Sequence, residues 1–205
     1  MPPVSRAKHA IRIAPRFEIL LPEAVATPNS WAIRLDPGPG FGDGSHDTTI
    51  LCLQALAALA PRGRSFRLLD FGSGSGILSI AAAAHWGAHV DAVEIDARAI
   101  EHAKGNLLLN GVGHRVRLLR YLAETTGKYE LIVANILRDV LLAHATALTE
   151  RLDAPGTLIL SGLVSTDVPE LGARYAARLD TRPEIYARDE WRALVFRRGS
   201  HAPPE

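Results

Sequence analysis

The feature that most constrains the fold is a regular alternation, from residue 66 onward, of short apolar runs with longer stretches of helical periodicity. Glu130-Leu-Ile-Val-Ala134 is apolar almost throughout, which is typical of a strand buried on both faces of a parallel sheet. Helices must then cover both faces. The predicted strands are Phe66–Phe71, His89–Ile95, Val116–Leu119, Tyr129–Ala134 and Thr157–Leu163. The predicted helices are Ile77–Trp86, Ala97–Asn110, Leu137–Leu152 and about 167–179.

The end of the chain adds strands of a different kind. The pattern over Pro183–Arg198 predicts two antiparallel strands joined by a turn at Arg188-Asp189-Glu190. An antiparallel pair on a parallel sheet is compatible with a doubly wound fold, and 205 residues suffice for one such domain. We therefore predict an α/β fold with a Rossmann-like, seven-stranded, mostly parallel sheet. Helices cover both of its faces, and an antiparallel strand pair closes its C-terminal end.

The first 60 residues follow other patterns. Apolar residues alternate with polar or small ones in the first region, over 1–35, which predicts a short hairpin or extended arm; the alternating residues are Ile11, Ile13, Phe17, Ile19 and Leu21. Residues 36–45 hold four glycines and two prolines and predict a shaped loop. A helix over about 46–60 should follow, with Ile50, Leu53, Leu56, Ala57 and Leu59 on its inner face. We expect an arm over 1–35, a main domain over 36–198 and a disordered tail over 199–205.

Charge and cysteine content argue against several classes of function. The net charge is +1 and the arginines are scattered, so we expect no surface for nucleic acid. The single cysteine, Cys52, permits no internal disulfide and no cysteine-based zinc site, and we expect no metal. The N-terminus lacks the apolar core of a signal peptide, and no apolar run reaches about 18 residues. We therefore expect a cytoplasmic protein that does not enter a membrane.

A glycine-rich turn joins the first predicted strand of the alternation to its helix. Asp70 lies in the strand end that leads into Gly72, Gly74 and Gly76. Glycines let the backbone turn sharply and approach a ligand closely, while the helix N-terminus offers free N–H groups. The spacing is Gly-x-Gly-x-Gly and not the Gly-x-Gly-x-x-Gly expected for a pyrophosphate, and Glu94 follows at the end of the next strand, where a carboxylate can accept both ribose hydroxyls. S-adenosylmethionine, a nucleoside without phosphate, suits this pattern.

Each of these residues also has an interpretation without a ligand. The three glycines could serve tight turning alone, and Glu94 could be a solvent-exposed strand end. Asp96 is a rival for the ribose, although it could equally cap the helix that begins at Ala97.

Asn135 ends the strand Tyr129–Ala134 at the edge where ligands bind in this class of fold. Its side chain can accept a hydrogen bond from an amine while a neighbouring backbone carbonyl accepts another. Two acceptors would direct the nitrogen lone pair at a methyl group, which makes Asn135 the candidate catalytic residue. The alternative is a helix N-cap before Leu137.

Together these segments resemble the ribosomal protein L11 methyltransferase family. The resemblance rests on a Gly/Pro loop ending in His46-Asp-Thr-Thr49, on Leu51-Cys-Leu53, on Gly72–Leu78, on Ala134-Asn-Ile-Leu137, and on Ser161-Gly162 and Glu190-Trp191. It runs from about Ile11 to Arg198. It implies S-adenosylmethionine as cofactor, with contacts from Thr49, Gly72, Glu94 and Asn135.

Two departures from the family pattern concern the acceptor. The usual Gly-Thr-Gly of the loop is Gly42-Asp43-Gly44 here, which adds an acid near the expected substrate mouth. Family members typically begin with a further N-terminal domain that grips the ribosomal protein, and this chain is expected to keep only the connecting arm, about residues 8–34.

The resemblance implies a protein N-methyltransferase that acts on a lysine ε-amino or N-terminal α-amino group, with ribosomal protein L11 or another protein as partner. Asp43 and Glu124 are candidates to take the proton of the amine, and His46 could be a base or could orient the loop and start the next helix. Three alternatives stay open. They are another methyl acceptor such as a small amine or nucleobase, a nicotinamide-dependent dehydrogenase, and a cofactor-binding protein without activity.

Overall fold

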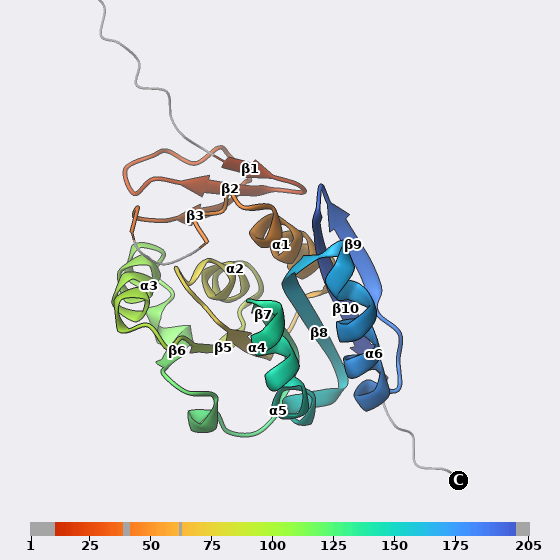
Figure 1. The fold of residues 1–205 in the computed structure, drawn as a ribbon. Coiled ribbons are helices and arrows are strands. Elements are labelled where there is room, and N and C mark those ends of the chain that lie inside the picture. The colour runs from red at the N-terminus through yellow and green to blue at the C-terminus, as the bar shows by residue number, and fades with distance from the viewer. Residues whose placement is uncertain (1–10, 39–41, 62, 200–205) are drawn as a thin grey trace, which may run out of the picture.

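A seven-stranded sheet forms the centre of the computed structural model, which describes residues 11–38, 42–61 and 63–199. Its strand order is β6-β5-β4-β7-β8-β10-β9. The first five strands in that order run parallel, and β10 pairs antiparallel with both β8 and β9 (Figure 1). The bounds are β4 Arg67–Phe71, β5 His89–Val93, β6 Val116–Leu119, β7 Tyr129–Asn135, β8 Leu152–Val164, β9 Glu184–Arg188 and β10 Trp191–Arg198. The predicted fold class is confirmed.

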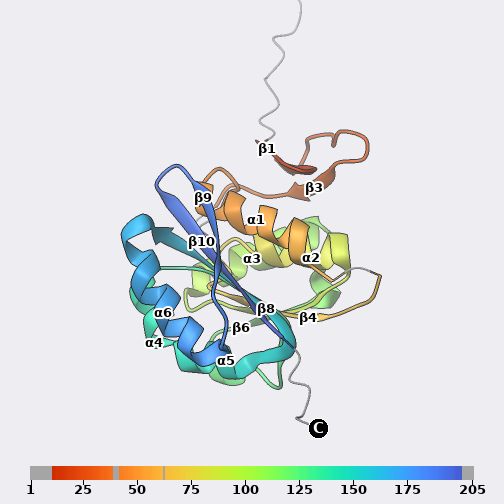
Figure 2. The same cartoon turned by 90° about the vertical axis from the view of Figure 1, so that its right-hand side faces the viewer.

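Helices cover both faces of this sheet (Figures 1 and 2). One layer holds α1 (Asp47–Leu59), α2 (Ile77–Trp86) and α3 (Ala97–Leu109), and the other holds α4 (Arg138–Ala143), α5 (Ala145–Arg151) and α6 (Val168–Leu179). Short 3-10 turns lie at Gly113–Arg115, Leu122–Glu124 and Ser165–Asp167. Within the described ranges, no helix has both the length and the apolar character needed to cross a membrane.

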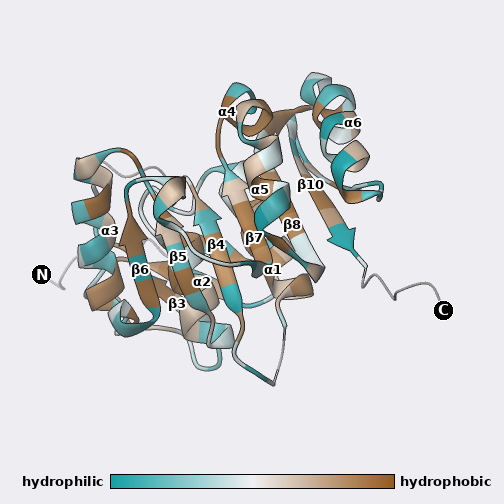
Figure 3. Cartoon of the chain, turned by 90° about the horizontal axis from the view of Figure 1, so that it is seen from below, coloured by the Kyte–Doolittle hydropathy of each residue, from teal (hydrophilic) through white to brown (hydrophobic). Residues whose placement is uncertain are grey.

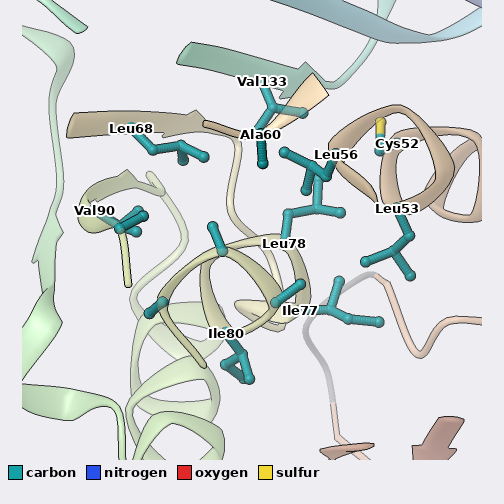
Figure 4. Packing of buried hydrophobic residues seen from close by; sticks show 14 of the residues in the cluster. Cys52, Leu53, Leu56, Ala60, Leu68, Ile77, Leu78, Ile80, Val90 and Val133 are labelled. Atoms are coloured by element: carbon teal, nitrogen blue, oxygen red, sulfur yellow. The ribbon is translucent and has the colours of Figure 1, made fainter. Parts of the chain in front are cut away.

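Two apolar cores lie between these layers. Leu68 belongs to the core under α1 and α2, and the next residue, Leu69, to the core under α4, α5 and α6. Successive residues of β4 are therefore buried on opposite faces, which explains the continuous apolar runs of the sequence (Figure 3). Figure 4 shows the first core, where Leu56 and Leu78 from two helices point toward each other.

The N-terminal segment forms a small sheet of its own outside α1 and α2 (Figure 1). Its strands are β1 (Ile11–Ile13), β2 (Phe17–Leu20) and β3 (Trp31–Arg34). The hairpin β1–β2 agrees with the predicted alternation, whereas the parallel strand β3 was not predicted. Glu18 is buried and accepts hydrogen bonds from Thr27 and Ser30, so its carboxylate holds the loop that leads to β3.

Two elements differ from the sequence expectation by more than two residues. The single helix predicted over Leu137–Leu152 is two helices that meet at His144, whose backbone leaves helical geometry (φ −99°, ψ 7°) and whose ring packs on Phe71. Strand β8 begins at Leu152 and not at Thr157, because Leu152 pairs with Tyr129 ahead of a register shift. Apart from Gly199, the tail expected to be disordered lies outside the described residues.

The two leucines Leu56 and Leu108 give a matched test of this packing. Leu56 is fully buried between α1 and the sheet, and Leu108 on α3 is 72% exposed. We expect Leu56→Ala to lower the free energy of unfolding by about 2–5 kcal/mol, because it removes buried methyl groups and leaves a cavity. Leu108→Ala should change it by less than about 0.5 kcal/mol. Urea unfolding of both variants measures the difference, and equal losses would contradict this description of the core.

Candidate active site

The candidate site lies where the direction of the chain across the sheet reverses. From β4 the chain continues to β5 and β6 on one side, then returns to β7 and β8 on the other side. In such sheets, ligands bind at the carboxyl ends of the two strands that flank the reversal. Phe71 of β4 pairs with Ala134 of β7, so the next residues, Gly72 and Asn135, begin this edge side by side.

The glycine turn after β4 is held by its neighbour β5. The N–H groups of Gly72 and Ser73 both donate to the Val93 carbonyl, at 2.9 and 3.0 Å. Gly72 and Gly76 have φ near +80°, and a Cβ at Gly72 would lie 3.0 Å from the Ile136 side chain. Geometry alone therefore requires glycine here, and the spacing by itself does not identify a ligand.

Glu94 links the end of β5 to the same turn. Its Oε2 accepts from the Gly74 N–H and its Oε1 from the Asp96 N–H, both at 3.0 Å. The carboxylate is half-buried and is not a loose strand end. Asp96 takes the other role considered for it, because its carboxylate accepts from the Arg98 N–H and caps α3.

Asn135 and Thr49 meet from two different elements. The Asn135 Nδ2 donates to the Thr49 hydroxyl at 3.4 Å, from the last position of β7 to the buried first turn of α1. The alternative role of Asn135 as a helix cap does not hold, since the N-cap of α4 is Leu137. The Asn135 Oδ1 forms no hydrogen bond with any residue in the described ranges, so it can accept one from a ligand.

Two buried polar atoms beside the turn also lack partners. Asp70 is completely buried in β4, where its Oδ2 accepts from the Ser79 hydroxyl at 2.6 Å. Its Oδ1 and the Ser73 hydroxyl have no hydrogen-bond partner among the described residues. His85 Nε2 is the only other buried polar side-chain atom of those residues without a partner. Burial raises the pKa of Asp70 to about 6, although the bond from Ser79 opposes the shift. Unsatisfied buried groups are costly, and these two lie beside the glycine turn.

The three candidates for proton transfer have structural partners. The Asp43 Oδ1 accepts from the Ser45 hydroxyl and N–H, which lowers the pKa of Asp43. His46 accepts from the Thr48 N–H as the N-cap of α1, and its ring packs against Trp191 at 4.9 Å. Glu124 accepts from two N–H groups of its own turn. No general base is placed by these contacts.

Three polar residues near the turn were not predicted from the sequence. Ser75 donates to the Gly42 carbonyl, Ser79 to Asp70, and Asn106 to the Ser75 carbonyl. The available signal was a polar residue on an otherwise apolar helix face: Asn106 shares the buried face of α3 with Ala99, Ala103 and Leu107. Such a residue must find a partner inside the protein.

Comparison with known proteins shows the family of the chain. The sequence profile of the ribosomal protein L11 methyltransferase family matches residues 2–199. The chain belongs to this family. The predicted resemblance to the family is thereby confirmed.

Individual relatives agree with this assignment. The ribosomal protein L11 methyltransferase of Pelobacter propionicus is 36% identical over 201 residues, which is 96% of this chain and 64% of that protein. The protein of the same name from Bacillus subtilis is 34% identical over 195 residues, 93% of this chain and 62% of the relative. The chain thus spans about three fifths of the length of these relatives.

Solved structures give the same result at the level of the fold. A ribosomal protein L11 methylase from Lactobacillus delbrueckii subsp. bulgaricus superposes with a TM-score of 0.84 at 30% identity, covering 93% of this chain and 99% of that one. A methyltransferase from Pyrococcus furiosus shares the fold, with a TM-score of 0.68 and 17% identity. The superposition covers 82% of this chain and 89% of that one.

The raised pKa of Asp70 predicts a specific pH dependence of stability. The ordinary pKa of an aspartate is 3.8, and that of folded Asp70 is about 6. Between these two pH values, Asp70 keeps a proton in the folded protein that it has lost in the unfolded chain. Its contribution therefore favours folding at low pH and is lost as the pH rises through about 6. Relative to Asp70→Asn, the wild-type protein should lose about 2 kcal/mol of stability between pH 4 and pH 7. Urea unfolding of both proteins across this range tests the prediction; a pH-independent difference would contradict it.

Proposed function

We propose that the chain is an S-adenosylmethionine-dependent N-methyltransferase that acts on an amine of a protein, a lysine ε-amino or N-terminal α-amino group. The observation that carries this proposal is the position of Glu94 and Asn135 on either side of the glycine turn, at the reversal of the sheet. The proposal is also supported by membership of the ribosomal protein L11 methyltransferase family.

The polar groups of the site fit this cofactor better than a dinucleotide. Glu94 lies next to the turn, where a carboxylate can accept the two hydroxyls of a ribose. Asp70 and Ser73 offer unpartnered oxygens beside the same turn, suited to the polar groups of an amino-acid moiety. The turn lacks the Gly-x-Gly-x-x-Gly spacing that aligns a helix with a pyrophosphate, which disfavours a dehydrogenase.

Asn135 is the residue proposed to orient the acceptor. When bound, S-adenosylmethionine supplies a methyl group on a positively charged sulfur, which is already a good leaving group. The chain then has to align a neutral amine and exclude water, and well-oriented reactants gain about 7–11 kcal/mol. The Asn135 Oδ1, free of other described partners, accepts from the amine N–H while Thr49 holds the amide from behind. This fixes the direction of the nitrogen lone pair.

The acceptor must lose a proton to become nucleophilic. A free lysine has a pKa of about 10.4 and is mostly charged at neutral pH. Ile136 and Leu137 follow Asn135, and Leu137 is 74% exposed, so an acceptor side chain beside Asn135 would meet apolar surface. Desolvation there lowers the pKa of an amine.

The acceptor and the organisation of the chain complete the proposal. Relatives over most of this chain carry the name ribosomal protein L11 methyltransferase, so ribosomal protein L11 is the first acceptor to test. Residues 36–198 are proposed as the methyltransferase domain and residues 1–35 as an arm of short strands. Transfer of a labelled methyl group into purified L11 and into a lysate distinguishes L11 from another protein, a nucleobase or a small amine.

Glu94 and Glu124 provide a matched test of the ribose contact. Each carboxylate accepts two backbone N–H groups near the same edge of the sheet, but only Glu94 bonds the glycine turn. Glu94→Gln should weaken binding of S-adenosylhomocysteine about 10–100-fold, through loss of hydrogen bonds to a charged group. Glu124→Gln should leave the affinity within about twofold. Isothermal calorimetry measures both, and equal effects would remove Glu94 from the cofactor site.

Asn135→Ala tests the catalytic role. We expect turnover to fall at least about 100-fold, because the variant loses a contact that orients the acceptor. Binding of S-adenosylmethionine should stay detectable by calorimetry. Unchanged turnover would refute the role of Asn135 in orienting the acceptor.

A further inference from the structure

Ser75 joins two loops that are far apart in the sequence. It lies between Gly74 and Gly76 in the glycine turn and is 1% exposed. Its hydroxyl donates to the Gly42 carbonyl at 2.6 Å and also accepts from the Ile77 N–H at 3.3 Å. The cofactor turn is therefore bonded directly to the loop that carries Asp43 and leads into His46.

Asn106 of α3 bonds the same turn and the beginning of the same loop. It is fully buried; its Nδ2 donates to the Ser75 carbonyl and its Oδ1 accepts from the Asp36 N–H, each at 2.9 Å. The loop is thus tied to Ser75 near both ends, at Asp36 through Asn106 and at Gly42 directly. A buried amide with partners on two separate segments restricts both segments.

The same face of α3 continues this connection to the arm. One turn further along, Asn110 accepts from the Arg34 N–H and donates to the Arg34 carbonyl. On the other side, the His102 Nε2 lies 2.7 Å from the Asp36 carbonyl. His102, Asn106 and Asn110 are spaced four residues apart and so share one face of the helix. Together they bond the free backbone edge of β3 and the residues that follow it, as a neighbouring strand would.

The loop lies next to the contact between Thr49 and Asn135. A Cβ on Gly42 would lie 3.3 Å from the Ser75 hydroxyl and 3.9 Å from the Thr49 hydroxyl, so the Ser75–Gly42 bond lies next to the Thr49–Asn135 contact. Only six residues separate Gly42 from Thr49, so the loop runs directly into the first turn of α1 that supports Asn135. Misplacements of about 1 Å can cost about 100-fold in rate.

We propose that Ser75 and Asn106 are positioning residues that couple the cofactor turn to the acceptor-side loop, so that ligand binding at the turn orders residues 42–48. The inference rests on the proposed function, because it takes S-adenosylmethionine as the ligand of the turn. It adds a role for two residues that have no part in orienting the methyl acceptor directly.

Hydrogen exchange followed by mass spectrometry tests this coupling without any acceptor. In the wild-type protein, S-adenosylhomocysteine should slow amide exchange in the 72–76 turn and in the 42–48 segment. Ser75→Ala removes the hydroxyl and keeps the carbonyl that Asn106 bonds. We expect this variant to retain slow exchange at the turn. The ligand-dependent protection factor at 42–48 should fall about two- to tenfold, which corresponds to the loss of one hydrogen bond.

Two further variants make the test specific. Asn106→Leu has a similar volume, loses both the donor to Ser75 and the acceptor for the Asp36 N–H, and should have the same effect on the loop. Thr149→Val is the control, because it removes a buried hydroxyl bonded to a backbone carbonyl on α5, on the opposite face of the sheet. It should leave ligand-dependent protection at 42–48 unchanged. Turnover should fall in the first two variants while the dissociation constant of S-adenosylhomocysteine stays within about threefold.

Each outcome separates the coupling from the proposed function. If Ser75→Ala and Asn106→Leu keep the wild-type protection of both the loop and the turn, the coupling is overturned and the proposed function stands. If Thr149→Val also loses protection of the loop, the effect is explained by a general loss of stability, and the coupling is overturned. Absence of any protection in the wild-type protein would contradict the proposed function and remove the inference with it.

Discussion

The parallel pairing of β4 with β7 is the constraint on which the rest of the site depends. It sets Phe71 beside Ala134, so the glycine turn and Asn135 begin at the same level of the sheet. Both strands are buried on both faces, and their register is fixed by two apolar cores. The chemistry of the edge therefore rests on the packing beneath it.

Polar groups carried by different elements converge on this edge. Glu94 from the end of β5 bonds the turn, Thr49 from α1 supports Asn135, and Asn106 from α3 bonds Ser75. Asp70 is the exception, because its carboxylate is buried with one oxygen unpartnered and a pKa raised to about 6. A buried charge of this kind costs stability, which is a common feature of functional sites. A positively charged ligand beside it would offset part of that cost.

The architecture and the candidate site residues could be predicted from the sequence, because both predictions depend on local pattern. Apolar runs predicted the mostly parallel sheet, and glycine spacing with the acid after β5 predicted the turn. Local pattern missed β3, because this strand of four residues is too short to show a period of its own and is defined by its parallel pairing with β2. It missed the break at His144, whose ring packs on Phe71 from a distant part of the chain. Ser75 and Asn106 depend on contacts between distant segments, which single-sequence patterns do not encode.

The central claim is that this edge binds a nucleoside without phosphate that carries a charged sulfur. Calorimetric titration of the purified chain with S-adenosylmethionine, with reduced nicotinamide adenine dinucleotide as the comparison, tests it most directly. We predict saturable heat at one site per chain for the first ligand and none for the second. No heat with S-adenosylmethionine, or tighter binding of the dinucleotide, would contradict the account.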